Sequence, residues 1–86
     1  MAITPESILP DAQNSALING VNVRKGSVAA VLANINVYES PLSSEADKQS
    51  ALDVIKGLAP ALKAIGLTQH LRFNNSEIQA LIDHAA

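Results

Sequence analysis

The stretch ALINGVNVRKGSVAAVLANINVYE, residues 16–39, decides the fold because its hydrophobic period changes half-way along. In its first part, Asn19-Gly20 stands between two short apolar arms, 17–18 and 21–23. Asparagine and glycine both tolerate the positive φ angles of a two-residue type I′ turn. This part predicts a β-hairpin, whose short arms need another element to pack against.

From Ser27 onward, apolar residues recur at intervals of three and four, which is the spacing of one helical face. The residues on that face are Val28, Val31, Leu32, Ile35 and Tyr38. Gly26 lets the chain turn out of the strand, and the Ser27 hydroxyl is expected to cap the first turn. Pro41 ends the helix by the residue before it. The prediction is a helix over residues 27–39.

The second half of the chain predicts two further helices. Ser44, with Asp47 three residues later, imitates a capping box. A stripe expected to be buried follows at Leu52, Ile55, Leu58, Ala59, Leu62 and Ile65. Pro60 should either kink this helix or restart it, and Gly66 is expected to close it as a C-cap glycine.

The last helix is expected to begin at Asn74, which forms a capping pair with Glu77. Its expected buried face consists of Ile78, Leu81, Ile82 and Ala85.

Two shorter segments have weaker patterns. The alternation in HLRF, residues 70–73, is compatible with a third short strand beside the hairpin. Thr4 and Pro5 predict a single helical turn near the N-terminus. The fold class is therefore α+β: a short hairpin, with or without a third strand, packed on about three helices in one domain, residues 1–86.

Composition excludes several classes of function. The 86 residues carry a net charge of −2, with interspersed signs, so duplex DNA is a poor partner. No cysteine is present, which removes disulfides and thiolate chemistry. The first ten residues lack the features of a secretory signal, and the longest apolar run, VAAVLA, is too short to span a bilayer. A cytoplasmic protein is expected.

No catalytic constellation is visible, so we expect no enzymatic activity and no cofactor. His70 and His84 share no metal-ligand spacing, and a metal site is not expected. Asp53 and Lys56 have the spacing of a surface ion pair on one helix.

One candidate binding site lies at the start of the helix over 27–39. Arg24, Lys25, Gly26 and Ser27 combine two cations with the free amides of a helix N-terminus, which are the ingredients of an anion site. The P-loop pattern is absent. The alternative is a strand, a glycine turn, a serine cap and solvated cations. Asn34 also has two interpretations, structural hydrogen bonding or ligand contact.

A candidate interface lies on the same helix. Ala29, Ala30, Ala33 and Val37 make a second strip that is apolar but small, and small side chains suit a two-fold pairing of identical helices. This strip predicts a homodimer. The competing interpretation is that the N-terminal segment, with Ile3, Ile8 and Leu9, folds back over the strip.

The segments VRKGSVAAVLANINVYES, residues 23–40, and LAPALKAIGLTQHLRF, residues 58–73, resemble a small bacterial family of uncharacterised proteins. The matching positions are Gly26, Ser27, Val28, Ala29, Ala30, Asn34, Ile35, Tyr38, Pro60, Leu62, Gly66 and Leu67. The resemblance implies an intracellular bacterial protein and adds no activity. The sequence thus favours a non-enzymatic interaction or oligomerisation module, with a binder of a small anionic ligand as the alternative.

Overall fold

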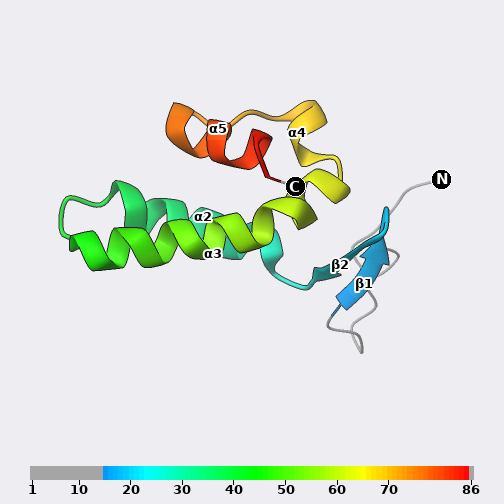
Figure 1. The fold of residues 1–86 in the computed structure, drawn as a ribbon, viewed down its shortest axis with the longest axis horizontal. Coiled ribbons are helices and arrows are strands. Elements are labelled where there is room, and N and C mark those ends of the chain that lie inside the picture. The colour runs from blue at the N-terminus through cyan, green and yellow to red at the C-terminus, as the bar shows by residue number, and fades with distance from the viewer. Residues whose placement is uncertain (1–14, 86) are drawn as a thin grey trace.

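The computed structural model describes residues 15–85 and has an α+β architecture (Figure 1). The elements are β1 Ser15–Ile18, β2 Val21–Arg24, α2 Ser27–Glu39, α3 Glu45–Ala64, α4 Leu67–His70 and α5 Ser76–Asp83. The predicted fold class is confirmed: a two-stranded antiparallel hairpin accompanies the helices. The turn predicted at Thr4 and Pro5 lies outside the described residues, and so does the N-terminal segment of the competing fold-back interpretation.

The hairpin turns at Asn19-Gly20, as predicted. Ile18 pairs with Val21 across the turn, so the loop has two residues. Asn19 and Gly20 have φ angles of 47° and 80°, the positive values that a type I′ turn requires. The Asn19 side chain also donates a hydrogen bond of 2.6 Å from Nδ2 to the carbonyl oxygen of Ala64. This bond fixes the hairpin tip to the C-terminal end of α3.

Of the two alternatives, a hairpin with or without a third strand over residues 70–73, the structure has the one without it. Within residues 15–85 the sheet has two strands, and residues 67–70 form the single helical turn α4 instead. The amide of Leu71 donates to the carbonyl oxygen of Leu67 at 2.9 Å, which closes that turn. Four alternating residues are too few to distinguish a strand from an irregular segment with one apolar side.

Helix α2 has the predicted bounds, but it begins differently. Gly26, with φ of 82°, occupies the N-cap position, and the turn has no side-chain cap. The Ser27 hydroxyl instead donates to the carbonyl oxygen of Arg24 at 2.6 Å, and the side chain is buried. The predicted Ser27 cap is therefore wrong, because the serine lies one position inside the helix and its hydroxyl points back to the strand.

The beginning and end of α3 follow the sequence prediction. Ser44 and Asp47 form a reciprocal capping box, and Gly66 follows the helix with φ of 85°. Pro60 lies inside a single helix that continues to Ala64, so the helix does not restart there. Ile65 was expected to be buried and is exposed, because it lies beyond the last residue of α3.

Helix α5 begins one residue later than predicted. Asn75, not Asn74, is its N-cap, and the Asn75 side chain accepts hydrogen bonds from the amides of Glu77 and Ile78. Asparagine at either position satisfies the sequence pattern, and only the backbone conformation decides between them.

The core is aliphatic, as the shortage of aromatic residues predicted. Helices α2 and α3 lie side by side and antiparallel, and α5 packs against α3 (Figure 1). The buried cluster between them consists of Val31, Ile35, Ile55, Ala59, Leu62, Ile78 and Ile82. Only one side of α2 takes part in this cluster, and the exposed side of the helix borders the candidate functional site.

Candidate functional site

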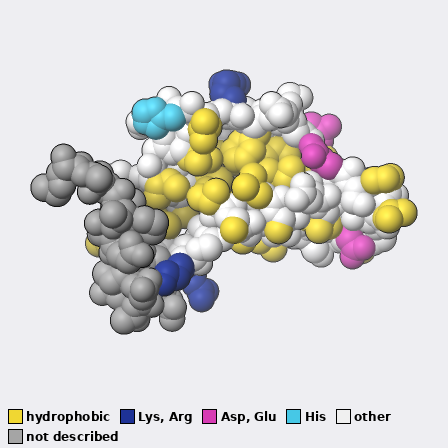
Figure 2. All heavy atoms as spheres, turned by 180° about the vertical axis from the view of Figure 1, so that it is seen from behind, with side chains coloured by type: hydrophobic (Ala, Val, Ile, Leu, Met, Phe, Trp, Pro, Cys, Tyr) yellow, Lys and Arg dark blue, Asp and Glu magenta, His cyan; other side chains and the backbone are white. Residues whose placement is uncertain are grey.

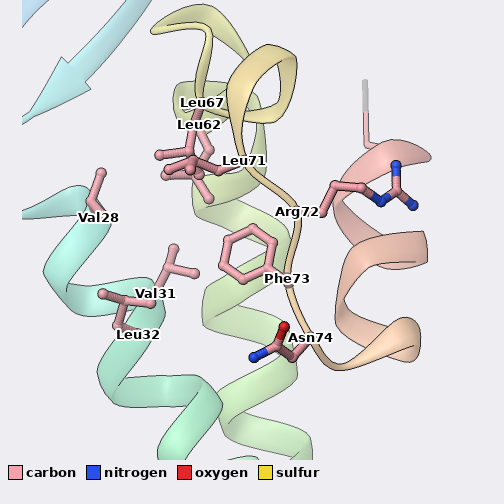
Figure 3. A pocket seen from close by; sticks show the side chains of 9 residues that line it. All are labelled: Val28, Val31, Leu32, Leu62, Leu67, Leu71, Arg72, Phe73 and Asn74. Atoms are coloured by element: carbon pink, nitrogen blue, oxygen red, sulfur yellow. The ribbon is translucent and has the colours of Figure 1, made fainter.

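An apolar cleft opens between α2 and the segment that joins α4 to α5 (Figure 3). Its volume is about 300 Å³. The side chains that line it are Val28, Val31, Leu32, Leu62, Leu67, Leu71, Arg72, Phe73 and Asn74. The cleft thus has the apolar lining of a hydrophobic binding site and the size of a small one.

The close view shows how the lining side chains are arranged. The Phe73 ring lies between α2 and the connecting segment, while Leu62, Leu67 and Leu71 gather at one end (Figure 3). The guanidinium of Arg72 points away from the cleft toward α5 (Figure 3). The interior therefore offers apolar contact and carries no charged group.

Gln79 anchors the connecting segment that forms one wall. Its side chain is only 4% exposed, and its Oε1 accepts a hydrogen bond of 2.6 Å from the amide of Phe73. Its Nε2 donates to Oδ1 of Asp83 at 2.9 Å. A buried amide side chain therefore sets the position of Phe73, and sequence reasoning did not identify it.

The exposed side of α2 borders this cleft. We call it the outer face and define it by Ala29, Leu32, Ala33, Asn36 and Val37, all of which are exposed. The sequence contains no charged residue from position 26 to position 38. A helix that is hydrophobic around most of its circumference is normally covered on all sides. In this chain, the described residues cover only one side of α2.

Leu32 belongs to both features, because it lines the cleft and is 50% exposed on the outer face. The cleft and the outer face together therefore form one continuous surface that is largely apolar, which we call the apolar surface. Hydrophobic side chains gather across the middle of this side of the molecule, which is hollowed (Figure 2). Leu71, 59% exposed, adds a large side chain at the cleft.

The structure partly changes the predicted assignment of faces on α2. Leu32 was expected on the buried stripe, but consecutive residues differ by about 100° around a helix, and Leu32 is turned away from the buried Val31. Of the predicted interface residues, Ala29, Ala33 and Val37 are exposed and Ala30 is half-buried. These positions are accessible to another surface, and self-association stays a prediction.

Cleft residues 71–74 were not identified as a site from the sequence. Their alternating pattern indicated a strand instead, although Leu71 and Phe73 were placed correctly on one side of the segment.

The structure supports only some of the features on which the predicted anion site depends. Arg24 and Lys25 are exposed beside the first turn of α2, and Gly26 has the left-handed conformation that leads into it. The Ser27 hydroxyl, however, is buried and donates its hydrogen bond to the carbonyl oxygen of Arg24. Anion binding would therefore depend on the backbone amides and the two cations, and it stays a prediction.

A second, polar hollow is lined by Tyr38, Glu45, Lys48, Gln49 and Leu52. The Tyr38 hydroxyl donates a hydrogen bond to the Glu77 carboxylate, which links the end of α2 to α5. This hydrogen bond raises the pKa of Tyr38 above 10.0, and desolvation and the negative charges of Glu77 and Glu45 act in the same direction.

Asn34 has a structural role. Its Nδ2 donates to the carbonyl oxygen of Ala30, one turn earlier in α2, at 2.8 Å. Among residues 15–85, no group of three or more potential metal ligands is present. Likewise, no helix in the described part of the chain has the length and apolarity needed to cross a membrane.

The chain matches no family model, no curated protein and no solved structure. Its likeness to a small bacterial family therefore stays a prediction.

Proposed function

We propose that this protein is a small non-enzymatic interaction module whose docking surface is the continuous apolar surface formed by the outer face of α2 and the adjoining cleft. One observation carries the proposal. Leu32 is half exposed on a helix that has no charged residue before its last position, and it also lines an open apolar cleft. Contiguous exposed apolar patches on small proteins commonly mark interaction sites.

The energetic argument favours a covered surface. Fully burying one leucine side chain contributes roughly 1.5–3 kcal/mol. Leu32 and Leu71 are 50% and 59% exposed, so both would gain from a partner that fills the cleft. A chain of 86 residues has limited core to offset the exposure of such side chains.

The lining of the cleft supports binding rather than catalysis. Arg72 and Asn74 are the only polar residues among its lining side chains, and neither is a suitable nucleophile or general base. The Arg72 side chain also points away from the cleft (Figure 3). Shape and hydrophobicity, rather than acid–base chemistry, are what this site provides.

Photo-crosslinking in cells of the organism that encodes the protein tests the proposal. A photoreactive phenylalanine analogue at position 32 should give protein adducts of defined mass. The matched control is position 54, because Val54 is an exposed apolar residue, 43% exposed, on α3 and outside the cleft. An absence of adducts from position 32, or equal adducts from both positions, would contradict the proposal.

Anion binding at the start of α2 is the second candidate, favoured by the two exposed cations beside a helix with no acidic residue in its first turn. Phosphate at millimolar concentration should then shift the amide signals of Val28 and Ala29. The double substitution Arg24→Ala and Lys25→Ala should abolish the shift. If these amide signals do not respond to phosphate, this candidate is excluded.

A further inference from the structure

We infer that the partner of the apolar surface is a second copy of this chain, docked with its α2 antiparallel to the first about a two-fold axis at Leu32. The inference rests on the proposed function, because it uses the same surface. It adds the identity of the partner and the register of the contact. It is supported by the opposite charges at the two ends of α2 and by their equal spacing from Leu32, in addition to the apolarity of the surface.

The two ends of α2 carry opposite charges. Arg24 and Lys25 precede its first turn, and Glu39 is its last residue. Glu77 lies at the same acidic end, since it accepts the hydrogen bond of Tyr38. A helix of 13 residues separates the two ends by about 20 Å. On this side of the molecule, basic side chains lie near the hairpin and at the upper edge, whereas acidic ones gather toward the far end (Figure 2).

This polarity favours one orientation of a second copy. An antiparallel two-fold pairing places the basic end of each α2 over the acidic end of the other. A parallel pairing places like charges together at both ends, which is unfavourable. A two-fold contact is also self-complementary, so one surface serves both copies.

The sequence spacing fixes the centre of the contact. Lys25 and Glu39 each stand seven residues from Leu32, so a two-fold axis at Leu32 brings the charged ends into register. Within α2, the exposed stripe 29–32–36–39 takes steps of three, four and three residues. That alternation is the seam spacing of paired helices. Leu32 thus stands midway between the basic and the acidic end of the helix.

The same arrangement explains the open cleft. Leu32 stands at the mouth of the cleft, beside α2, and is half exposed. At the two-fold axis, Leu32 of the second copy meets Leu32 of the first and covers the mouth of the cleft. The apolar side chains that are exposed on this side among residues 15–85 are then removed from water.

Disulfide trapping of the purified protein tests the orientation, because the chain has no cysteine of its own. Leu32→Cys should link to itself on mild oxidation. Ala29→Cys and Asn36→Cys should link only when the two variants are mixed. In the antiparallel pairing, positions 29 and 36 differ by about 1.5 Å along the helix axis. Two copies of position 29 are about 9 Å apart along that axis and two copies of position 36 about 12 Å, beyond the Cα separation of about 7 Å that a disulfide spans.

Val54→Cys is the control for random collisions, and circular dichroism of each variant verifies folding. We expect covalent dimer from the mixture at least ten-fold above that from either variant alone or from Val54→Cys. Self-linking of Ala29→Cys alone would overturn the inference in favour of a parallel pairing. If no cysteine variant or mixture forms covalent dimer faster than Val54→Cys, self-pairing itself would be overturned. In that case, adducts of another mass from position 32 in cells would still support the proposed function, whereas their absence would contradict both.

Discussion

Gln79→Leu tests how the wall of the cleft is held in place. The substitution removes the acceptor of the Phe73 amide and the bond to Asp83, while leucine has a similar size. Loss of a partner for a largely buried amide costs about 1–3 kcal/mol. Greater burial of apolar surface by leucine offsets part of this cost, so we expect a net destabilisation of about 1–2 kcal/mol. For a domain of this length the melting temperature should fall by roughly 4–16 °C.

Gln49→Leu is the matched control. Gln49 donates to Oδ1 of Asp53 at 3.0 Å, four residues later on the exposed side of α3, which reproduces the Gln79–Asp83 bond without the backbone acceptor role. Thermal unfolding followed by circular dichroism should show a change of less than about 0.5 kcal/mol for the control. Amide exchange of Phe73 should accelerate only in Gln79→Leu. Equal melting temperatures for the two variants would refute the anchoring role of Gln79.

Four further predictions concern the turn, a glycine within α3, the tyrosine and the core. Gly20→Val should destabilise the fold by about 1–3 kcal/mol because the turn holds φ at 80°. Gly57→Ala, in open space within α3, should stabilise the fold by about 0.5–1 kcal/mol. Urea unfolding measures both changes, and an unchanged free energy of unfolding in Gly20→Val would contradict the turn assignment. The chain has a single tyrosine and no tryptophan, so absorbance near 295 nm should give a native pKa of Tyr38 above 10.0 that falls in Glu77→Gln. The pKa of Tyr38 is higher in the folded than in the unfolded state, so the stability contributed by the Tyr38–Glu77 hydrogen bond is present below pH 10 and is lost as pH rises through the folded pKa. A native pKa at or below 10.0 would contradict this hydrogen bond. Ile55→Ala should cost about 2–5 kcal/mol because Ile55 is fully buried, and a loss below 1 kcal/mol would contradict its central position.

Local sequence signals predicted most of the fold. Asn19-Gly20 indicated the hairpin because few residues accept two consecutive positive φ angles. The bounds of α2 and the capping box at Ser44 followed from periodicity and capping chemistry. These features depend on neighbouring residues only, which is why single-sequence reasoning identified them.

The cleft was not predictable in the same way. It depends on contacts between α2 and residues 71–74, which lie about forty positions apart in the chain. Gln79 is buried only because the segment carrying Phe73 folds back onto α5, and a glutamine at such a position reads as a surface residue. Leu32 illustrates the same limit. Its spacing fits the buried stripe, but the number of helices available to cover α2 decides its exposure.

Sedimentation equilibrium tests most directly the claim that the apolar surface of α2 is a docking surface for a second copy. Across micromolar to millimolar concentrations, the wild type and Val54→Glu should approach twice the chain mass of 9.0 kDa. Leu32→Glu, which places a charge at the proposed two-fold axis, should remain at 9.0 kDa while keeping its native circular dichroism spectrum. A wild type that stays at 9.0 kDa over the whole range would contradict the claim.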